Sequence, residues 1–133
     1  MAQAFKFDLV SPEKLLLSDS VDAVVIPGTD GEMTVMANHA PVMTSLRPGI
    51  VTVSRTGTAP DRFVVFGGFA DITPEACTLL AESAVRVSDI DRADLERRTQ
   101  AAQENLKDAK DPAARARIEE LLGQLSLLQS ALS

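Results

Sequence analysis

Residues 27–49 read PGTDGEMTVMANHAPVMTSLRPG, with turn-forming residues at both ends and in the middle. Glycine and proline mark turns because glycine reaches positive φ and proline fixes its own φ. Proline also biases the residue before it toward extended backbone, so Ala40-Pro41 predicts a stiff, exposed connection. The segment therefore predicts a Gly-x-x-Gly-Glu loop, a short strand and the His39-Ala40-Pro41 connection, followed by Pro48-Gly49.

Short apolar runs separated by turns continue on both sides of this segment. Phe5, Phe7 and Leu9 alternate with polar residues, which is the period of a half-buried strand. Further runs cover residues 21–26, 50–53, 62–66, 69–73 and 76–80, with turn residues at 56–61, 67–68 and 74–75. We interpret Gly67-Gly68 as a two-residue hairpin turn. The prediction for residues 1–87 is an antiparallel β-sandwich, or flattened barrel, of about ten strands.

The pattern becomes helical at residue 88. Ser88 or Asp89 can cap a helix, and Ser88-x-x-Asp91 has the outline of a capping box. Asp111-Pro112 restarts a helix, with aspartate as N-cap and proline at the first position. The apolar residues of the first helix that share one face are Leu95, Ala102, Leu106 and Ala109; those of the second are Ile118, Leu121, Leu122, Leu125, Leu128 and Leu132. We predict an antiparallel two-helix hairpin over residues 88–133, joined near Lys110.

The predicted hairpin is only weakly anchored. Burying six apolar side chains contributes about 12 kcal/mol as an upper bound, and ordering about 20 residues costs at least as much. Because the free energy gained by burial nearly equals the cost of ordering, the helical pair can leave one surface and dock on another. Residues 88–133 are therefore expected to form a mobile element with a possible regulatory role.

Composition restricts the partners of the chain. Its 133 residues suffice for about one domain, and 45% hydrophobic content fills an ordinary core. A net charge of −6 argues against nucleic acid, so the expected partners are proteins. The sequence contains no apolar run of 18 residues, and membrane association is expected only through another protein. The single cysteine, Cys77, is expected to be buried and inert.

No catalytic residue and no metal site are predicted. His39 is the only histidine, which argues against zinc sites and against a cupin-like β-sandwich enzyme that binds a metal through several histidines. The chain has no Gly-x-x-x-x-Gly-Lys-Ser/Thr phosphate loop, and Asp30 and Glu32 make the Gly28–Glu32 loop repel anions. We therefore expect no ATP hydrolysis by this chain alone and no cofactor.

The order of these motifs, from the Gly-x-x-Gly-Glu loop through His-Ala-Pro and Pro-Gly to Gly67-Gly68, resembles the epsilon subunit of the F-type ATP synthase. The resemblance covers essentially the whole chain. It implies a non-catalytic central-stalk rotor subunit that links the gamma subunit to the c-ring and couples proton translocation to ATP synthesis. It also implies a peripheral position on the cytoplasmic face of the bacterial inner membrane.

The resemblance also implies candidate site residues. The family's counterpart of the first loop meets the polar loops of the c-ring, which makes Gly31 and Glu32 candidate contacts. His39, Ala40 and Pro41 correspond to a region that faces the rotor interface. The alternative to an interface role for His39 is a structural one, in a turn with one hydrogen-bonded imidazole.

The same resemblance raises ATP as a regulatory ligand. Asp89, Arg92 and Ala93 match the end of the motif Ile/Leu-Asp-x-x-Arg-Ala, through which some bacterial epsilon subunits bind ATP, although Ser88 replaces the Ile or Leu. The alternative is an ordinary first-turn ion pair between Asp89 and Arg92. Residues 121–133 carry no charge, whereas tails that brake hydrolysis contact the alpha/beta catalytic head through basic residues. We therefore expect at most weak inhibition, with the tail packed on the sandwich or on gamma.

Overall fold

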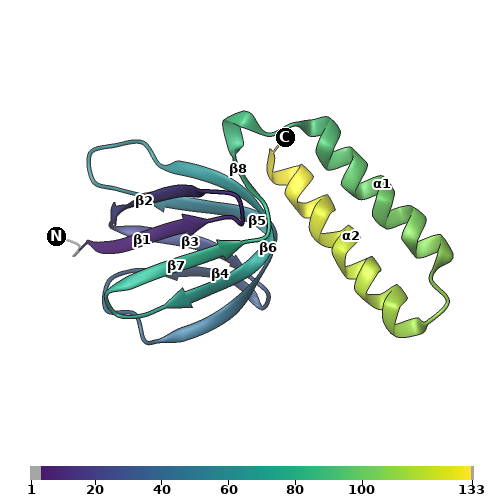
Figure 1. Ribbon diagram of the computed structural model, residues 1–133, viewed down its shortest axis with the longest axis horizontal. Coiled ribbons are helices and arrows are strands. Elements are labelled where there is room, and N and C mark those ends of the chain that lie inside the picture. Colours follow the sequence, from purple (N-terminus) through teal and green to yellow (C-terminus); the bar gives the residue numbers. More distant parts are fainter. Residues whose placement is uncertain (1–3, 133) are drawn as a thin grey trace. The chain divides into compact units, whose positions relative to one another are not determined.

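The computed structural model describes residues 4–132, which form eight strands followed by two α-helices (Figure 1). The strands are β1 (Phe5–Val10), β2 (Leu15–Val21), β3 (Ala23–Gly28), β4 (Gly31–Val35), β5 (Val42–Ser54), β6 (Asp61–Ile72), β7 (Ala76–Ala81) and β8 (Ala84–Arg86). A 3-10 helix (Val87–Asp89) precedes α1 (Arg92–Asp108) and α2 (Pro112–Leu132). The chain divides after Ser88 into two compact units. The predicted fold class, a β-sandwich followed by a helical hairpin, is confirmed.

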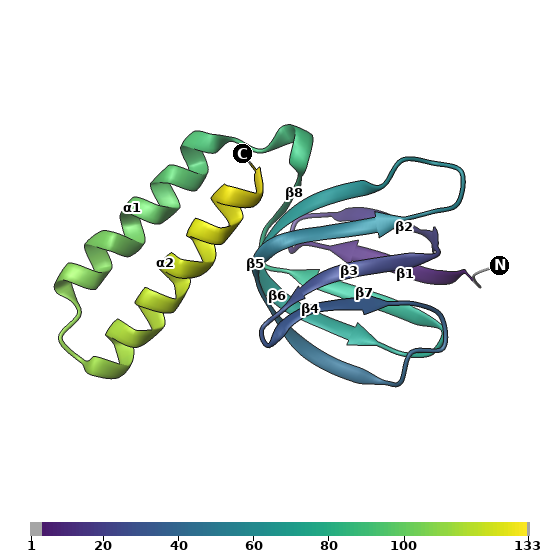
Figure 2. The same ribbon diagram turned by 180° about the vertical axis from the view of Figure 1, so that it is seen from behind.

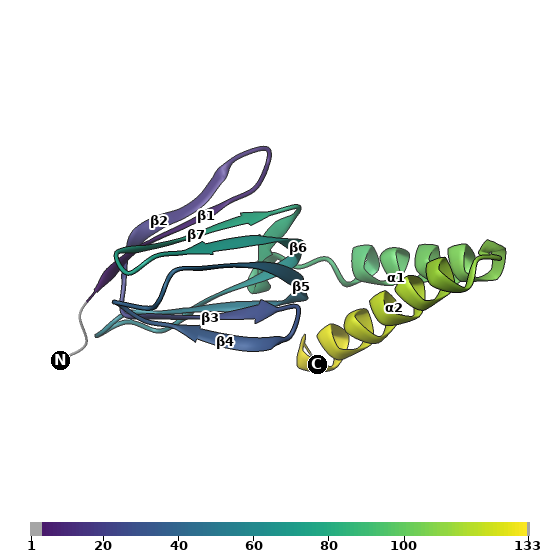
Figure 3. The same ribbon diagram turned by 90° about the horizontal axis from the view of Figure 1, so that it is seen from below.

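The sandwich forms because β5 and β6 are long enough to take part in both layers. The strand order is β2-β1-β7-β6-β5-β3-β4, with β8 also paired to β6. One half of β6, Gly68–Ile72, pairs with β7, whereas Phe63–Val65 pairs with β8. Figure 3 shows β1, β2 and β7 in one layer and β3 and β4 in the other, and Figure 2 shows β3 beside β4.

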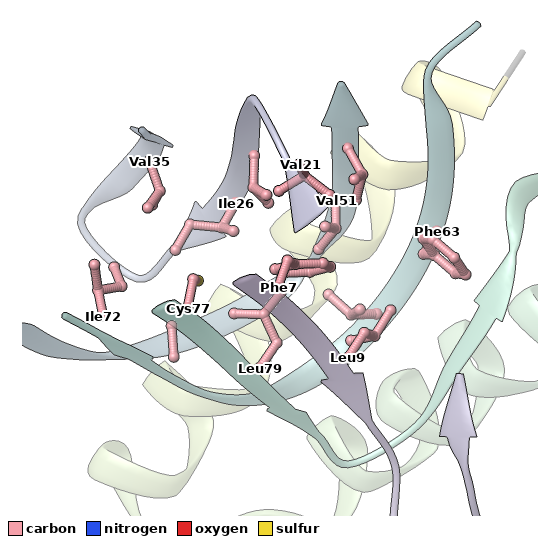
Figure 4. Close-up of a cluster of buried hydrophobic side chains, with 14 of the residues drawn as sticks. Phe7, Leu9, Val21, Ile26, Val35, Val51, Phe63, Ile72, Cys77 and Leu79 are labelled. Carbon is pink, nitrogen blue, oxygen red and sulfur yellow. The ribbon is translucent and has the colours of Figure 1, made fainter. Parts of the chain in front are cut away.

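The core lies between these two layers. Phe7, Ile26, Val51 and Leu79 come from four different strands and are fully buried, and their side chains point toward one another (Figure 4). The alternation predicted for the first strand is confirmed, because Phe5, Phe7 and Leu9 are buried while Lys6 is exposed. Such a core makes the sandwich a rigid body on which surface residues keep fixed positions.

Two features of the predicted sheet were wrong. The described residues form eight strands, slightly fewer than the approximately ten expected. Gly67-Gly68 is no hairpin turn: both residues lie inside β6, with φ of 98° and 132°. A Cβ on Gly68 would lie 2.1 Å from the carbonyl oxygen of Leu80, so glycine allows β6 to bend closely against β7. One long bent strand therefore replaces two predicted short ones.

The sheet is also not wholly antiparallel. β1 and β7 pair in parallel, from Lys6 opposite Ala76 to Val10 opposite Leu80. This pairing joins segments about 70 positions apart in the sequence, and the local pattern of either strand carries no information about it.

The hairpin begins later than the predicted capping box. The N-cap of α1 is Asp91, whose Oδ1 accepts from the amide of Ala93 at 2.9 Å, and Ser88 lies in the preceding 3-10 helix. The predicted start of the second helix is confirmed, because α2 begins at Pro112 and Asp111 Oδ1 accepts from the amide of Ala113 at 3.4 Å. The residues of the two helices that are buried are Leu95, Ala102, Leu125 and Leu128.

Candidate partner-binding surface

A row of apolar side chains crosses the outer face of the sandwich. Successive register pairs place Leu15 opposite Val10, Val10 opposite Leu80, and Leu80 opposite Phe69. Residues opposite each other in register share a face of the sheet, and the inward neighbours of this row, such as Leu79 and Ala70, are buried. We call Leu15, Val10, Leu80 and Phe69 the outer apolar stripe.

The outer apolar stripe is largely exposed. Leu15 is 59% exposed, Phe69 56% and Leu80 54%. A shallow groove of about 290 Å³ runs along it, and the residues that line this groove are Val10, Ser11, Pro12, Gly68, Phe69, Leu80, Ala81 and Glu82. Contiguous exposed apolar surface bordered by polar residues is typical of protein interfaces. Among the residues described, this surface suits an apolar protein partner.

Sequence reasoning missed the outer apolar stripe, although one signal pointed to it. In a half-buried strand only every second residue should be apolar, yet Leu79 and Leu80 are adjacent. One of the two leucines must therefore face outward. Phe69 follows two glycines that resemble a turn in the sequence, so its outward position could not be assigned from the sequence.

Gly31 and Glu32 lie in a strand and not in a loop. Gly31 has φ of 134° and pairs with Gly28 at the β3–β4 turn, and a Cβ on it would touch nothing within 4 Å. Glu32 is the second residue of β4, pairs with Pro27 and is exposed. Its carboxylate is thus presented from a fixed strand at the open edge of the sheet.

His39, Ala40 and Pro41 follow the other end of β4, so this strand separates them from Gly31 and Glu32. His39 is half-buried, and its Nδ1 donates to the carbonyl oxygen of Ala40 at 2.8 Å. The preceding Asn38 has φ of 66°, and its backbone N–H donates to the carbonyl oxygen of Pro74 at 2.9 Å. The connection is therefore tied to the β6–β7 turn, while Ala40 and Pro41 remain exposed.

Asp89, Arg92 and Ala93 do not converge on one point. Asp89 ends the 3-10 helix and is exposed, and it forms none of the ion pairs found among residues 4–132. Arg92 instead donates through Nη2 to the carbonyl oxygen of Leu132 at 2.7 Å. The amide of Ala93 is occupied by the N-cap, Asp91.

One charged cluster fixes β8 to the sandwich. Asp61 accepts hydrogen bonds from Arg55 and, at 3.2 Å, from Arg86 at the end of β8. The guanidinium of Arg86 also lies 4.9 Å from the centre of the Phe63 ring, a cation–π distance. The hydrogen bond from Arg55 is the main cause that lowers the pKa of Asp61 below its ordinary value, against the opposing effect of burial. The cluster is structural, because Asp61 pairs with both arginines and Arg55 Nε also lies 3.6 Å from Asp19 Oδ2.

Residues 4–132 offer neither an exposed thiol nor a metal-binding cluster. Cys77 is fully buried, and burial raises the pKa of its thiol to about 12. Between residues 4 and 132, no group of three or more His, Cys, Asp or Glu side chains is arranged to hold a metal ion. Within the same range, neither helix combines the length and apolar character needed to cross a membrane.

Relatives match this chain over nearly its whole length. A family model described as "ATP synthase, Delta/Epsilon chain, beta-sandwich domain" matches residues 4–87. The ATP synthase epsilon chain of Mesorhizobium japonicum is 62% identical over 99% of this chain and 98% of its own length. That of Chelativorans sp. is 60% identical with the same coverage, and that of Sinorhizobium medicae is 55% identical over 96% of this chain and 95% of its own length.

Two solved structures have the same fold. A chain in the cryo-EM structure of the Euglena gracilis mitochondrial ATP synthase (OSCP/F1/c-ring) is 28% identical, with a TM-score of 0.78 over 98% of this chain and 82% of that chain. One from the central stalk/c-ring structure of the Tetrahymena thermophila mitochondrial ATP synthase is 13% identical, with a TM-score of 0.73 over 99% and 98%, a likeness of fold alone. Together with the family match, these similarities show that the chain belongs to the ATP synthase epsilon chain family.

Proposed function

We propose that this chain is a non-catalytic central-stalk subunit of a bacterial ATP synthase, that it links the gamma subunit to the c-ring, and that it thereby couples proton translocation to ATP synthesis. The observation that carries the proposal is the outer apolar stripe on a rigid, fully packed sandwich. A subunit that transmits torque needs a stiff body with an apolar surface for a permanent partner, and obligate interfaces are the more apolar ones. The stripe is assigned to gamma.

The c-ring contact is assigned to a second surface, formed by β4 and the connection that follows it. Glu32 is held on β4 and exposed, and Ala40 and Pro41 are exposed beyond the other end of that strand. Polar groups at the edge of an interface fix its register more than its affinity. Gly31, Glu32, His39, Ala40 and Pro41 are therefore proposed to position the chain on the c-ring, and the chain to reach the membrane only through the complex, at its cytoplasmic face.

Residues 1–87 are proposed to act as the clamp and residues 88–133 as a regulatory element. The last described part of α2, from Leu121 to Leu132, carries no charge. It lacks the cations that a tight contact with acidic segments of the alpha/beta head would use, so its effect on ATP hydrolysis is proposed to be weak.

The test is recovery of the assembly from native membranes. The chain is tagged and expressed in its own organism, the membranes are solubilised gently, and copurified subunits are identified by mass spectrometry. We expect gamma, the head subunits and the c-ring in stoichiometric amounts. Recovery of the chain alone, or with unrelated proteins, would refute the proposed role.

A double variant tests the c-ring assignment. Glu32→Ala with His39→Ala should reduce recovery of the c-ring while the melting temperature of the isolated chain stays within a few degrees. The control is Glu104→Ala, which removes an exposed carboxylate from α1. Unfolding of the double variant would show that the two residues are structural and that the site assignment fails.

A further inference from the structure

The carboxyl end of α2 lacks cations of its own. A helix end carries unpaired carbonyl groups and a partial negative charge, which a nearby cation stabilises. The last turn of α2 contains no basic residue, and residues 121–132 include no charged side chain. The cation comes from the other helix, because Arg92, the first residue of α1, donates from Nη2 to the carbonyl oxygen of Leu132 at 2.7 Å.

The opposite end of the hairpin repeats this arrangement. α1 ends in extended backbone at Ala109, with φ of −74° and ψ of 125°, and has no left-handed glycine to close it. Arg115, in the first turn of α2, donates from Nη1 to the carbonyl oxygens of Leu106 at 2.9 Å and Ala109 at 3.2 Å. Each helix therefore carries in its first turn an arginine that caps the carboxyl end of the other.

We propose that Arg92 and Arg115 are reciprocal latches that close the hairpin without a ligand. Antiparallel packing places the first turn of each helix beside the last turn of its partner. Leu95 and Leu128, which lie between the latches, are buried. Opening the hairpin at either end requires that an arginine leave its carbonyl partner. The closed state is then a property of the chain itself, and it would stand even if the proposed place in the assembly were wrong.

The latch gives Arg92 a role that competes with nucleotide binding. The Nη2 of its guanidinium is bonded to Leu132, and the hollow beside it is lined by only one other charged residue, Glu96, whose carboxylate repels phosphate. Arg115 is bonded to the carbonyl oxygen of Leu106, which lies 14 residues after Arg92 on α1. At a rise of 1.5 Å per residue, the two bonding sites are roughly 20 Å apart. One nucleotide cannot join the two cations, so the hairpin is assigned a closed state that does not depend on ATP.

Amide hydrogen exchange on the full chain tests the latches separately. In Arg92→Gln, we expect exchange in the last turn of α2, residues 129–132, to be about two- to fivefold faster. In Arg115→Gln, the faster exchange should instead appear in the last turn of α1. The control is Arg97→Gln, which removes the same charge from an arginine that bonds Asp94 within α1 at 3.1 Å. Exchange in the sandwich serves as the internal reference.

The outcomes separate the latch from its alternatives. Equal effects of Arg92→Gln and Arg97→Gln on residues 129–132, or an effect confined to α1, would overturn the latch. Millimolar ATP should leave exchange in the wild-type hairpin unchanged. Slower exchange with ATP in the wild type that is lost in Arg92→Gln would identify Arg92 as a nucleotide ligand and overturn the assignment of an ATP-independent closed state.

Discussion

Replacing Phe69 with alanine should weaken the attachment of the chain to its assembly without weakening the fold. Phe69 points outward from β6 and is 56% exposed. An aromatic side chain can bury roughly 200 Å², so a partner could cover about 110 Å² more of it. At about 25 cal/mol per Å² this contributes about 2.8 kcal/mol at most, or roughly a hundredfold in Kd. The ordering costs of association reduce that figure, and we expect a loss of about ten- to a hundredfold.

The assay is rebinding of purified chain to ATP synthase from which this chain has been removed. The free energy of unfolding of Phe69→Ala, measured with urea, should change by less than about 0.5 kcal/mol because the side chain is outside the core. Thr58→Ala is the control, since Thr58 is exposed in the connection between β5 and β6 and does not line the groove along the outer apolar stripe. Unchanged affinity of Phe69→Ala, or an equal loss in the control, would refute the assignment of the outer apolar stripe as the gamma-binding surface.

Three further predictions concern the fold itself. Gly68→Ala should destabilise the sandwich by more than about 1 kcal/mol in urea unfolding, and by more than Gly57→Ala, because only Gly68 would place its Cβ 2.1 Å from a backbone oxygen; equal losses would contradict the close approach of β6 to β7. Asp61 has a lowered pKa, caused mainly by Arg55, so its stabilising contribution is present above the unfolded pKa of about 3.9 and is lost as the pH falls through the lower folded value. The difference in unfolding free energy between wild type and Asp61→Asn should therefore shrink on acidification, and a constant difference would argue against the pairing. Cys77, with a pKa raised to about 12 by burial, should resist a thiol reagent at about pH 8 until urea unfolds the chain, and rapid labelling of the native protein would show that its site is open.

Much of the fold could be predicted because its signals are local. The alternation of Phe5, Phe7 and Leu9 identified a strand, and Asp111-Pro112 identified a helix start, since each depends only on neighbouring residues. The turn at Pro74-Glu75 was also confirmed between β6 and β7. The ordered set of motifs was specific enough for the resemblance to be right.

What could not be predicted depends on distant partners. Gly67-Gly68 resembles a hairpin turn in isolation, and only its pairing with both β5 and β7 shows it to be a bend inside one strand. The outer apolar stripe joins residues from four strands, so no single run of sequence contains it. Arg92 matches a nucleotide motif by its neighbours, and its contact with Leu132, 40 residues later, is visible only in the folded hairpin.

The most direct test of the account is a cryo-EM map of the intact ATP synthase that contains this chain, at a resolution that shows side chains. We expect Phe69 and Leu80 to be buried against the gamma subunit and Glu32 to face the c-ring. A map in which the outer apolar stripe faces solvent, with gamma on another surface of the sandwich, would contradict the account.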